Sequence, residues 1–222
     1  MNSEEPKLLF LLAPVFVFCC CNLRAVAARD TITASNPLIV NHSIVSENGD
    51  FQLSLYAPDD YYYTSLAISC RKYNLDLTVW SVYIDSTVVT TTDLQLSISD
   101  DGNLILLSKE GSLIWSTNVT SPAASNSTVA VLLDSGNLVL RDGLNSSNVL
   151  WQSFDHPSDT WLPGAPLGFD QSTGNHIFLT SFAVDPSYYL SLDYVETVGS
   201  PQFVLQTNGP GINGQRIPPW GS

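Results

Sequence analysis

The chain has 222 residues, with 21 acidic against 8 basic side chains and a formal net charge of −13 at pH 7. Nucleic acids and anionic membrane surfaces both require a basic face on their protein partner, so this balance argues against either as a ligand. The length suffices for one sizeable hydrophobic core, which can stabilise a fold without disulfides.

The N-terminus has the pattern of a cleaved export signal. An apolar run from Leu8 to Cys21 follows Lys7 and leads into the small residues Ala25–Ala28. The run is shorter than the roughly 20 residues of a membrane-spanning helix, and Pro14 interrupts it, which disfavours a membrane anchor. We therefore predict a signal peptide over 1–28, a secreted or extracellular mature chain, and no membrane anchor in the rest of the sequence.

Cysteine use and glycosylation signals bear on the same prediction. Beyond the signal, Cys70 is the one remaining thiol, so no internal disulfide is possible. Cys70 is interpreted as a buried apolar residue, with an intermolecular bridge as the alternative. Asn-x-Ser/Thr sequons beside turn-forming residues are predicted glycosylation sites: they are Asn41, Asn118, Asn126 and Asn145.

Strand patterns come next along the chain. Short segments rich in Val, Ile, Leu, Thr and Tyr alternate with Gly, Asn, Asp and Ser clusters, and no helical period persists. The clearest are 51–56, 94–98, 103–107 and 137–140. These features predict an all-β protein.

An internal repeat underlies the strands. Asp101–Leu106 reads DGNLIL and Ser135–Leu140 reads SGNLVL, and a weaker copy lies at 48–53. Each copy is followed by an aliphatic-Trp-polar step, at Trp115, Trp151 and Trp80 respectively. One unit alone cannot bury its apolar face, so we expect three related sheets packed about an axis, with the tryptophans as a shared core.

These residues resemble a known family. The stretches 98–107 with 114–117, and above all 133–140 with Val149–Gly164 (VLWQSFDHPSDTWLPG), are similar to the bulb-type, mannose-binding lectin domain of plant S-locus glycoproteins and G-type lectin receptor-like kinases. The resemblance implies a threefold pseudo-symmetric β-prism over 29–154. It also implies that 155–222 is a partial, β-rich S-locus-glycoprotein-like segment.

The resemblance further implies where a sugar would bind. The family uses Gln-x-Asp-x-Asn-x-Val-x-Tyr, whose alternate residues line one face of a strand. The middle repeat supplies the corresponding positions, and the last repeat keeps only two matches. The middle positions are Ser99, Asp101, Asn103, Ile105 and Leu107, and the last-repeat matches are Asn137 and Val139. Asp-Gly-Asn and Ser-Gly-Asn are also favourable turn sequences, which is the alternative interpretation.

Two further departures from the family pattern are visible. After the first tryptophan, relatives usually read Trp-Val-Ala-Asn-Arg, whereas this chain reads Trp80-Ser81-Val82-Tyr83-Ile84. Relatives also continue into a cysteine-rich region, a membrane helix and a kinase, which are not in this sequence. The first departure removes the polar Asn-Arg pair of the relatives, so the family structure of the segment after Trp80 is in question.

Catalysis has little support in the sequence. Asp155, His156 and Asp159 could form an acid/base group, but they lie in a Pro-containing turn that the family resemblance explains structurally. No phosphate-binding loop, His/Cys metal spacing or nucleophile elbow is present. We therefore expect no enzyme activity, no metal and no cofactor.

Two functional hypotheses follow. The first is a secreted lectin-like module that binds mannose-type glycans or a glycoprotein, with Asp101 and Asn103 as the main polar contacts. The second is a receptor-like kinase ectodomain fragment, associated with the plasma membrane if part of a longer receptor. In that hypothesis the sugar sites are vestigial and the fragment acts in protein recognition or as a homodimer.

Overall fold

A computed structural model of the chain describes residues 29–56, 63–72, 77–85, 94–120, 127–169, 174, 176–180, 188–195, 200–207 and 215–216. The regular structure in these ranges is β-strand, apart from short 3-10 turns such as Ser153–Asp155. The predicted all-β class is therefore confirmed. Within the same ranges, no helix combines the length and the apolar composition that crossing a membrane requires.

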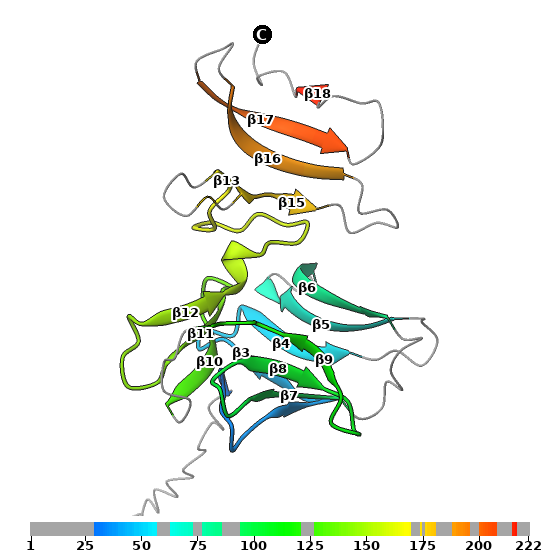
Figure 1. Ribbon diagram of the computed structural model, residues 1–222, viewed down its shortest axis with the longest axis vertical. Helices are drawn as coiled ribbons and strands as arrows, with labels where there is room; N and C mark the ends of the chain where they lie inside the picture. The colour runs from blue at the N-terminus through cyan, green and yellow to red at the C-terminus, as the bar shows by residue number, and fades with distance from the viewer. Residues whose placement is uncertain are drawn as a thin grey trace, which may run out of the picture.

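Three four-stranded antiparallel sheets form the larger body (Figure 1). The first has the order β3 (Ser43–Val45), β4 (Phe51–Tyr56), β5 (Tyr63–Cys70), β6 (Leu77–Asp85). The second has the order β2 (Leu38–Ile39), β7 (Gln95–Ile98), β8 (Leu104–Leu107), β9 (Leu113–Ser116). The third has the order β1 (Thr31–Ile32), β10 (Thr128–Leu132), β11 (Leu138–Asp142), β12 (Val149–Gln152). The short N-terminal strands thus contribute one edge to each sheet and tie the three together.

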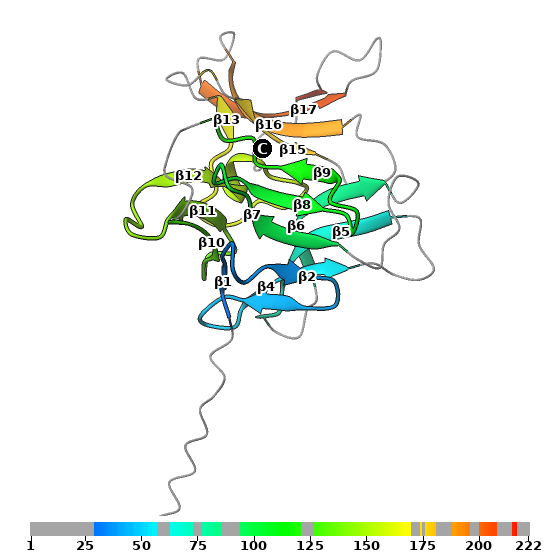
Figure 2. The same cartoon turned by 60° about the horizontal axis from the view of Figure 1, so that its bottom comes forward.

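The core lies where the three sheets face one another (Figure 2). Alternate residues of β8 point inward: Leu104 and Leu106 are fully buried, while Ile105 between them is not. Burying a leucine side chain contributes roughly 1.5–3 kcal/mol, so the periodicity of two accounts for the packing of the sheets. This arrangement is the β-prism that the sequence predicts.

The tryptophans of the three repeats meet at the core. Trp80, Trp115 and Trp151 contact one another edge to face, with ring centroids 6.5, 6.1 and 5.8 Å apart. Edge-to-face pairs add about 0.5–1.5 kcal/mol beyond burial. Their predicted role as a shared core is confirmed. The His156 ring stacks on Trp151 at 5.3 Å and lies at the edge of this cluster.

The structure corrects the alignment of the first repeat. In the other two sheets, the tryptophan strand pairs with the strand that directly follows the Gly-Asn turn: Trp115 lies opposite Leu106, and Trp151 opposite Leu140. Trp80 instead lies opposite Ile68 of β5. The Asn48-Gly49-Asp50 turn joins β3 to β4, one strand earlier. The equivalent connection, between β4 and β5, comprises residues 57–62, which lie outside the described residues.

A fourth four-stranded sheet follows the prism. Its order is β15 (Leu179–Thr180), β16 (Tyr188–Val195), β17 (Ser200–Thr207), β18 (Gln215–Arg216), and β13 (Gly168–Phe169) pairs separately with β14 (His176–Ile177). It lies above the prism in Figure 1. The connecting segment is attached to the prism core, because the indole N–H of Trp80 donates to the carbonyl of His156 at 2.8 Å.

Cys70 lies at the end of β5. Its side chain is half-buried and packs against the hydrophobic core, and its thiol is free. The interpretation as a packed apolar residue therefore describes its position well, although its burial is partial.

Candidate functional site

The five predicted positions of the middle repeat lie together along one hairpin. Ser99 and Asp101 belong to the turn between β7 and β8, Asn103 ends the turn, and Ile105 and Leu107 lie on β8. Ile105 and Leu107 are half-buried and point away from the core, because their neighbours Leu104 and Leu106 fill it. The structure thus aligns a polar turn with an apolar strand face.

The turn holds its polar groups in a fixed arrangement. Its three-residue loop closes with Gly102 at φ 82°, a left-handed conformation that glycine adopts without strain. The hydroxyl of Ser99 donates to the Asp101 carboxylate, and the backbone N–H of Asn103 approaches that carboxylate at 3.3 Å. The Asp101 carboxylate is therefore an exposed hydrogen-bond acceptor that the turn itself orients.

These contacts also set the protonation state of Asp101. The hydrogen bond from Ser99, followed by those from the side chain and backbone of Asn103, lowers the pKa of Asp101 below its ordinary value of 3.8. Hydrogen bonds to a carboxylate favour its charged form. Asp101 is consequently ionised, and able only to accept hydrogen bonds, across the physiological pH range.

Asn103 lies differently from Asp101. Its side chain is 6% exposed. Its amide oxygen accepts from the Thr117 hydroxyl at 2.9 Å and from the Val119 backbone N–H at 2.6 Å, while its amide nitrogen donates to the Val119 carbonyl at 3.2 Å. The Thr117 hydroxyl also accepts from the N–H of Leu104 at 3.1 Å. We call this set of contacts the asparagine clamp of the second sheet.

The third sheet repeats the clamp. The amide oxygen of Asn137 accepts from the Ser153 hydroxyl at 3.1 Å and from the Phe154 N–H at 3.2 Å, and its nitrogen donates to Gln152 at 2.9 Å. The Ser153 hydroxyl accepts from the N–H of Leu138 at 2.9 Å. In both sheets an asparagine therefore attaches the start of one strand to the chain that follows the tryptophan strand.

Among the described residues, the first sheet does not repeat this clamp. Val82 stands two residues after Trp80, where the other sheets place Thr117 and Ser153, and it has no hydroxyl. Strands β5 and β6 instead continue to pair as far as Tyr63 opposite Asp85. The departure in the sequence after Trp80 thus corresponds to a longer strand pair.

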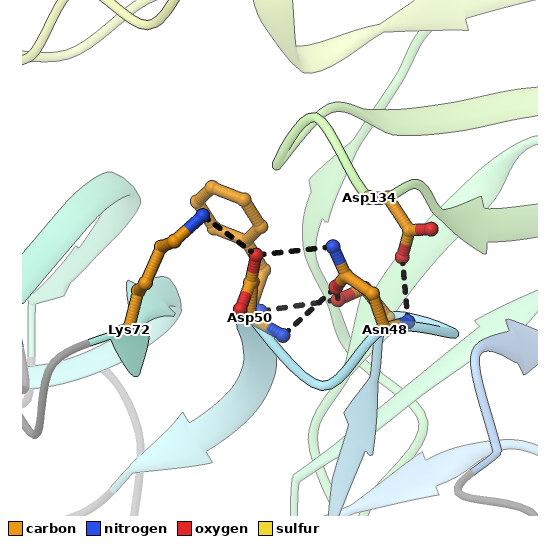
Figure 3. Close-up of polar contacts among 6 residues, drawn as sticks. Asn48, Asp50, Lys72 and Asp134 are labelled. Carbon is orange, nitrogen blue, oxygen red and sulfur yellow. Dashed lines mark hydrogen bonds and ion pairs between the residues drawn. The ribbon is translucent and has the colours of Figure 1, made fainter.

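The turn between β3 and β4 has a structural role of its own (Figure 3). The Asn48 backbone N–H donates to the carboxylate of Asp134, in the turn between β10 and β11 of the third sheet, at 2.8 Å. The Asn48 side chain donates to Asp50 at 3.1 Å, and Lys72 forms an ion pair with Asp50 at 3.4 Å. The contact between Asn48 and Asp134 joins the first and third sheets, and the other two contacts fix the turn itself. The polar groups of this turn therefore have a structural role.

The third-repeat positions offer little surface to a ligand. Asn137 is 6% exposed and Val139 is 3% exposed. Arg141 stands where the family motif has tyrosine, and it pairs across the sheet with Val129 and Val149. Of the two repeats that keep part of the motif, the middle one therefore has the more accessible polar turn.

An apolar row extends the middle face beyond Leu107. Register pairs place Ile39 opposite Gln95, Gln95 opposite Leu107, and Leu107 opposite Leu113. Ile39 is 44% exposed and Leu113 is 62% exposed. The outer face of the second sheet therefore passes from a polar turn at one end to an uncharged, largely apolar strip at the other. Sequence reasoning missed this row because its members come from four separate strands.

The remaining predicted residues have separate positions. The Asp155 carboxylate accepts from Gln152 at 2.9 Å and the Asp159 carboxylate accepts from Thr160 at 2.9 Å, so each has a different local partner. No group of three His, Cys, Asp or Glu side chains in the described part of the chain could hold a metal ion. Asn41, Asn118 and Asn145 are exposed, and Asn126 lies outside the described residues.

Comparison with known proteins finds a family model, several relatives and solved structures to which this chain is similar. Residues 78–183 match the family model of D-mannose binding lectins. A G-type lectin S-receptor-like serine/threonine-protein kinase of Arabidopsis thaliana is 35% identical over 201 residues, which cover 83% of this chain and 23% of the kinase. An S-locus-specific glycoprotein of Brassica oleracea is 34% identical over 210 residues, which cover 92% of this chain and 47% of the glycoprotein. A monomeric monocot mannose-binding lectin from Gastrodia elata aligns with a TM-score of 0.41 and 21% identity, covering 55% of this chain and 93% of the lectin.

Three antiparallel sheets around a tryptophan core, together with the match of residues 78–183 to the D-mannose binding lectin model, define a bulb-type lectin domain. The chain belongs to the bulb-type lectin family of S-locus glycoproteins and G-type lectin S-receptor-like kinases. It spans about a quarter of the length of the kinase and about half of that of the glycoprotein.

Proposed function

We propose that this protein is an extracellular recognition module without catalytic activity, and that it binds mannose-type glycans at the middle hairpin. The observation that carries the proposal is the oriented Asp101 carboxylate beside the apolar side chains of Ile105 and Leu107. A monosaccharide presents hydroxyl donors at its edge and C–H groups on its face. The carboxylate can accept from the hydroxyls, and the apolar side chains can pack against the C–H groups.

Each residue has a definite part in the proposed site. Asp101 accepts hydrogen bonds from two sugar hydroxyls, and Ile105 packs against the sugar's carbon face. Ser99 orients Asp101 and so makes no strong sugar contact of its own. Asn103 shapes the turn through its clamp, and its side chain supports the Asp101 carboxylate. Leu107 extends the apolar surface where a tyrosine hydroxyl would otherwise bind.

The proposal predicts a single weak site. Each hydrogen bond contributes only about 0.5–1.5 kcal/mol net, and a shallow face buries little apolar area. The clamp engages both hydrogen-bond acceptor positions of Asn103, and the third-repeat residues Asn137 and Val139 are almost fully buried. Monosaccharide binding is therefore expected at the middle hairpin alone.

Asp101→Asn tests this site, with Asp100→Asn as its control. Both carboxylates are exposed and adjacent, so the two variants change the net charge equally. Titration calorimetry with methyl-α-mannoside should show binding by the parent and by Asp100→Asn, and a loss of at least several-fold in Asp101→Asn. Equal affinities for all three proteins would refute the lectin mechanism.

A second candidate function is protein recognition or homodimer formation on the same face. The specific observation is the apolar row of Ile39, Leu107 and Leu113, of which Ile39 and Leu113 are exposed, on a chain whose net charge is −13. Exposed apolar patches commonly mark protein contacts. Sedimentation at micromolar concentration distinguishes this candidate: Leu113→Asp should dissociate a dimer, whereas a parent protein that is monomeric throughout would contradict it.

We also propose export with removal of residues 1–28. The support is Arg29, whose carbonyl accepts from the N–H of Val45 at 2.8 Å and whose side chain donates to the carbonyls of Thr31, Asn36 and Pro37. The first residue after the expected cleavage position is thus already bonded to the prism. N-terminal sequencing of protein from a secreting cell culture should read Arg-Asp-Thr, and retention of the first 28 residues would contradict export.

A further inference from the structure

We propose that an N-linked glycan on Asn118 covers the middle hairpin and limits its access to other glycans. The inference rests on the proposed function, because it concerns the regulation of the same site. Its ligand class is the oligomannose glycan that secretory cells attach to Asn-x-Ser/Thr sequons.

Asn118 lies between the two residues that bind Asn103. Thr117 donates to the Asn103 amide oxygen at 2.9 Å, and Val119 donates to the same oxygen at 2.6 Å. Successive Cα atoms are about 3.8 Å apart, so the Asn118 backbone lies within one residue of the clamp. A glycan attached there begins beside the turn that holds Asp101.

Asn118 also has the accessibility that modification requires. It is exposed and has a φ of 51°, a left-handed conformation typical of asparagine in a tight turn. Its backbone N–H donates to the Ser116 hydroxyl at 3.1 Å, and its side-chain amide makes no hydrogen bond with the described residues. The third sequon residue, Thr120, is exposed as well.

Strand direction separates Asn118 from the other sequons. Strand β9 runs antiparallel to β8 and therefore ends at the β7–β8 turn, where Asn118 follows it. Asn145 lies in the loop between β11 and β12, at the end of the third sheet away from the turn that contains Gly136. Its side-chain oxygen accepts from the Ser147 N–H at 3.2 Å. A glycan on Asn145 therefore serves as a comparison that does not share the site.

Tethering makes the Asn118 glycan an effective competitor. A ligand on a short flexible linker acts at an effective concentration on the order of millimolar. A shallow monosaccharide site has weak affinity, so a tethered mannose branch occupies it, or shields it sterically, ahead of dilute external sugar. Removal of this glycan should therefore raise the affinity for free mannose.

The experiment uses the full chain secreted from an insect or plant cell culture. Thr120→Ala abolishes the Asn118 sequon, and Ser147→Ala abolishes the Asn145 sequon, and each keeps its asparagine. Peptide mapping establishes glycan occupancy, and calorimetry with methyl-α-mannoside measures affinity. Enzymatic trimming of the folded parent protein gives a second measurement that requires no substitution.

We expect Thr120→Ala and the trimmed parent to bind methyl-α-mannoside several-fold more tightly than the untrimmed parent, and Ser147→Ala to match the untrimmed parent. An unoccupied Asn118 in the parent would overturn the inference. Equal affinities with and without the Asn118 glycan would overturn it while leaving the proposed function intact. Absence of binding in every form would overturn both.

Discussion

The amide oxygen of Asn103 accepts a hydrogen bond from the backbone N–H of Val119 at 2.6 Å, across 16 positions of sequence. The same oxygen accepts from Thr117, and the asparagine is nearly buried. A residue that the sugar motif marks as a ligand contact is thus also a structural link between β8 and the chain after β9. In the proposed lectin mechanism, stability and recognition are therefore joined at this position.

Replacing Asn103 should destabilise the fold. Asn103→Ala leaves the Val119 N–H without its acceptor, and an unsatisfied buried donor costs about 1–3 kcal/mol. We expect the free energy of unfolding, measured in urea, to fall by about that amount. Asp100→Ala, in the same turn but exposed, is the control. A loss for Asn103→Ala no greater than that of the control would contradict the clamp.

The two asparagine clamps should act as separate units. Residues that share a hydrogen-bond network show coupling energies of about 0.5–3 kcal/mol, whereas distant sites add. A double-mutant cycle of Asn103→Ala with Thr117→Val should therefore show coupling, because both remove the same contact. A cycle of Asn103→Ala with Ser153→Ala should be additive, because Ser153 belongs to the clamp of the third sheet. Additivity in the first cycle would count against the clamp.

Gly136 should tolerate no side chain. Its φ is +85°, and an added Cβ would lie 2.7 Å from the Phe51 ring and 2.8 Å from Leu162. Gly111 has a φ of +79° with nothing within 4 Å, so Gly111→Ala carries the backbone strain without the clash. Strain of this kind costs roughly 1–2 kcal/mol, and we expect Gly136→Ala to lower the melting temperature clearly further than Gly111→Ala. Equal melting temperatures would contradict the tight contact between Gly136, Phe51 and Leu162.

Ser99→Ala should raise the pKa of Asp101 toward 3.8, because the Ser99 hydroxyl is the first cause of its lowering. A lowered folded-state pKa means that Asp101 stabilises the fold above the ordinary carboxyl pKa and loses this contribution as pH falls through the folded value. The parent should thus lose this contribution below pH 3.8. Carboxyl NMR titration measures the shift.

Asp142 provides the internal control for that titration. Its pKa is also lowered, first by the backbone N–H of Leu144, which Ser99→Ala leaves in place. The pKa of Asp142 should therefore be the same in the parent and the variant. An unchanged pKa of Asp101 in Ser99→Ala would show that the turn does not orient its carboxylate.

Much of the fold was predictable because strong local signals agree with it. The two Gly-Asn turns mark the hairpins of the second and third sheets. The three tryptophans mark the core, where they contact one another. The first repeat was misaligned because Asn48-Gly49-Asp50 has the chemistry of the same turn but serves the preceding strand pair. Strands as short as β1 and β2 carry no detectable period, since each has two residues.

The candidate site was less predictable than the fold. Asp101 and Asn103 are two positions apart and look equivalent in the motif, yet one is exposed and the other nearly buried. The difference arises from Thr117 and Val119, which only the folded sheet brings to Asn103. A hydroxyl two residues after Trp115 and after Trp151, at Thr117 and Ser153, is the signal that could have revealed the clamps.

The central claim is that the middle hairpin, and not the third, binds the sugar. Amide chemical-shift mapping of unglycosylated protein during titration with methyl-α-mannoside tests it most directly. The account predicts that shifts concentrate at residues 99–107 and that those at 133–141 stay unmoved. Shifts centred on 133–141, or none at saturating sugar, would contradict it.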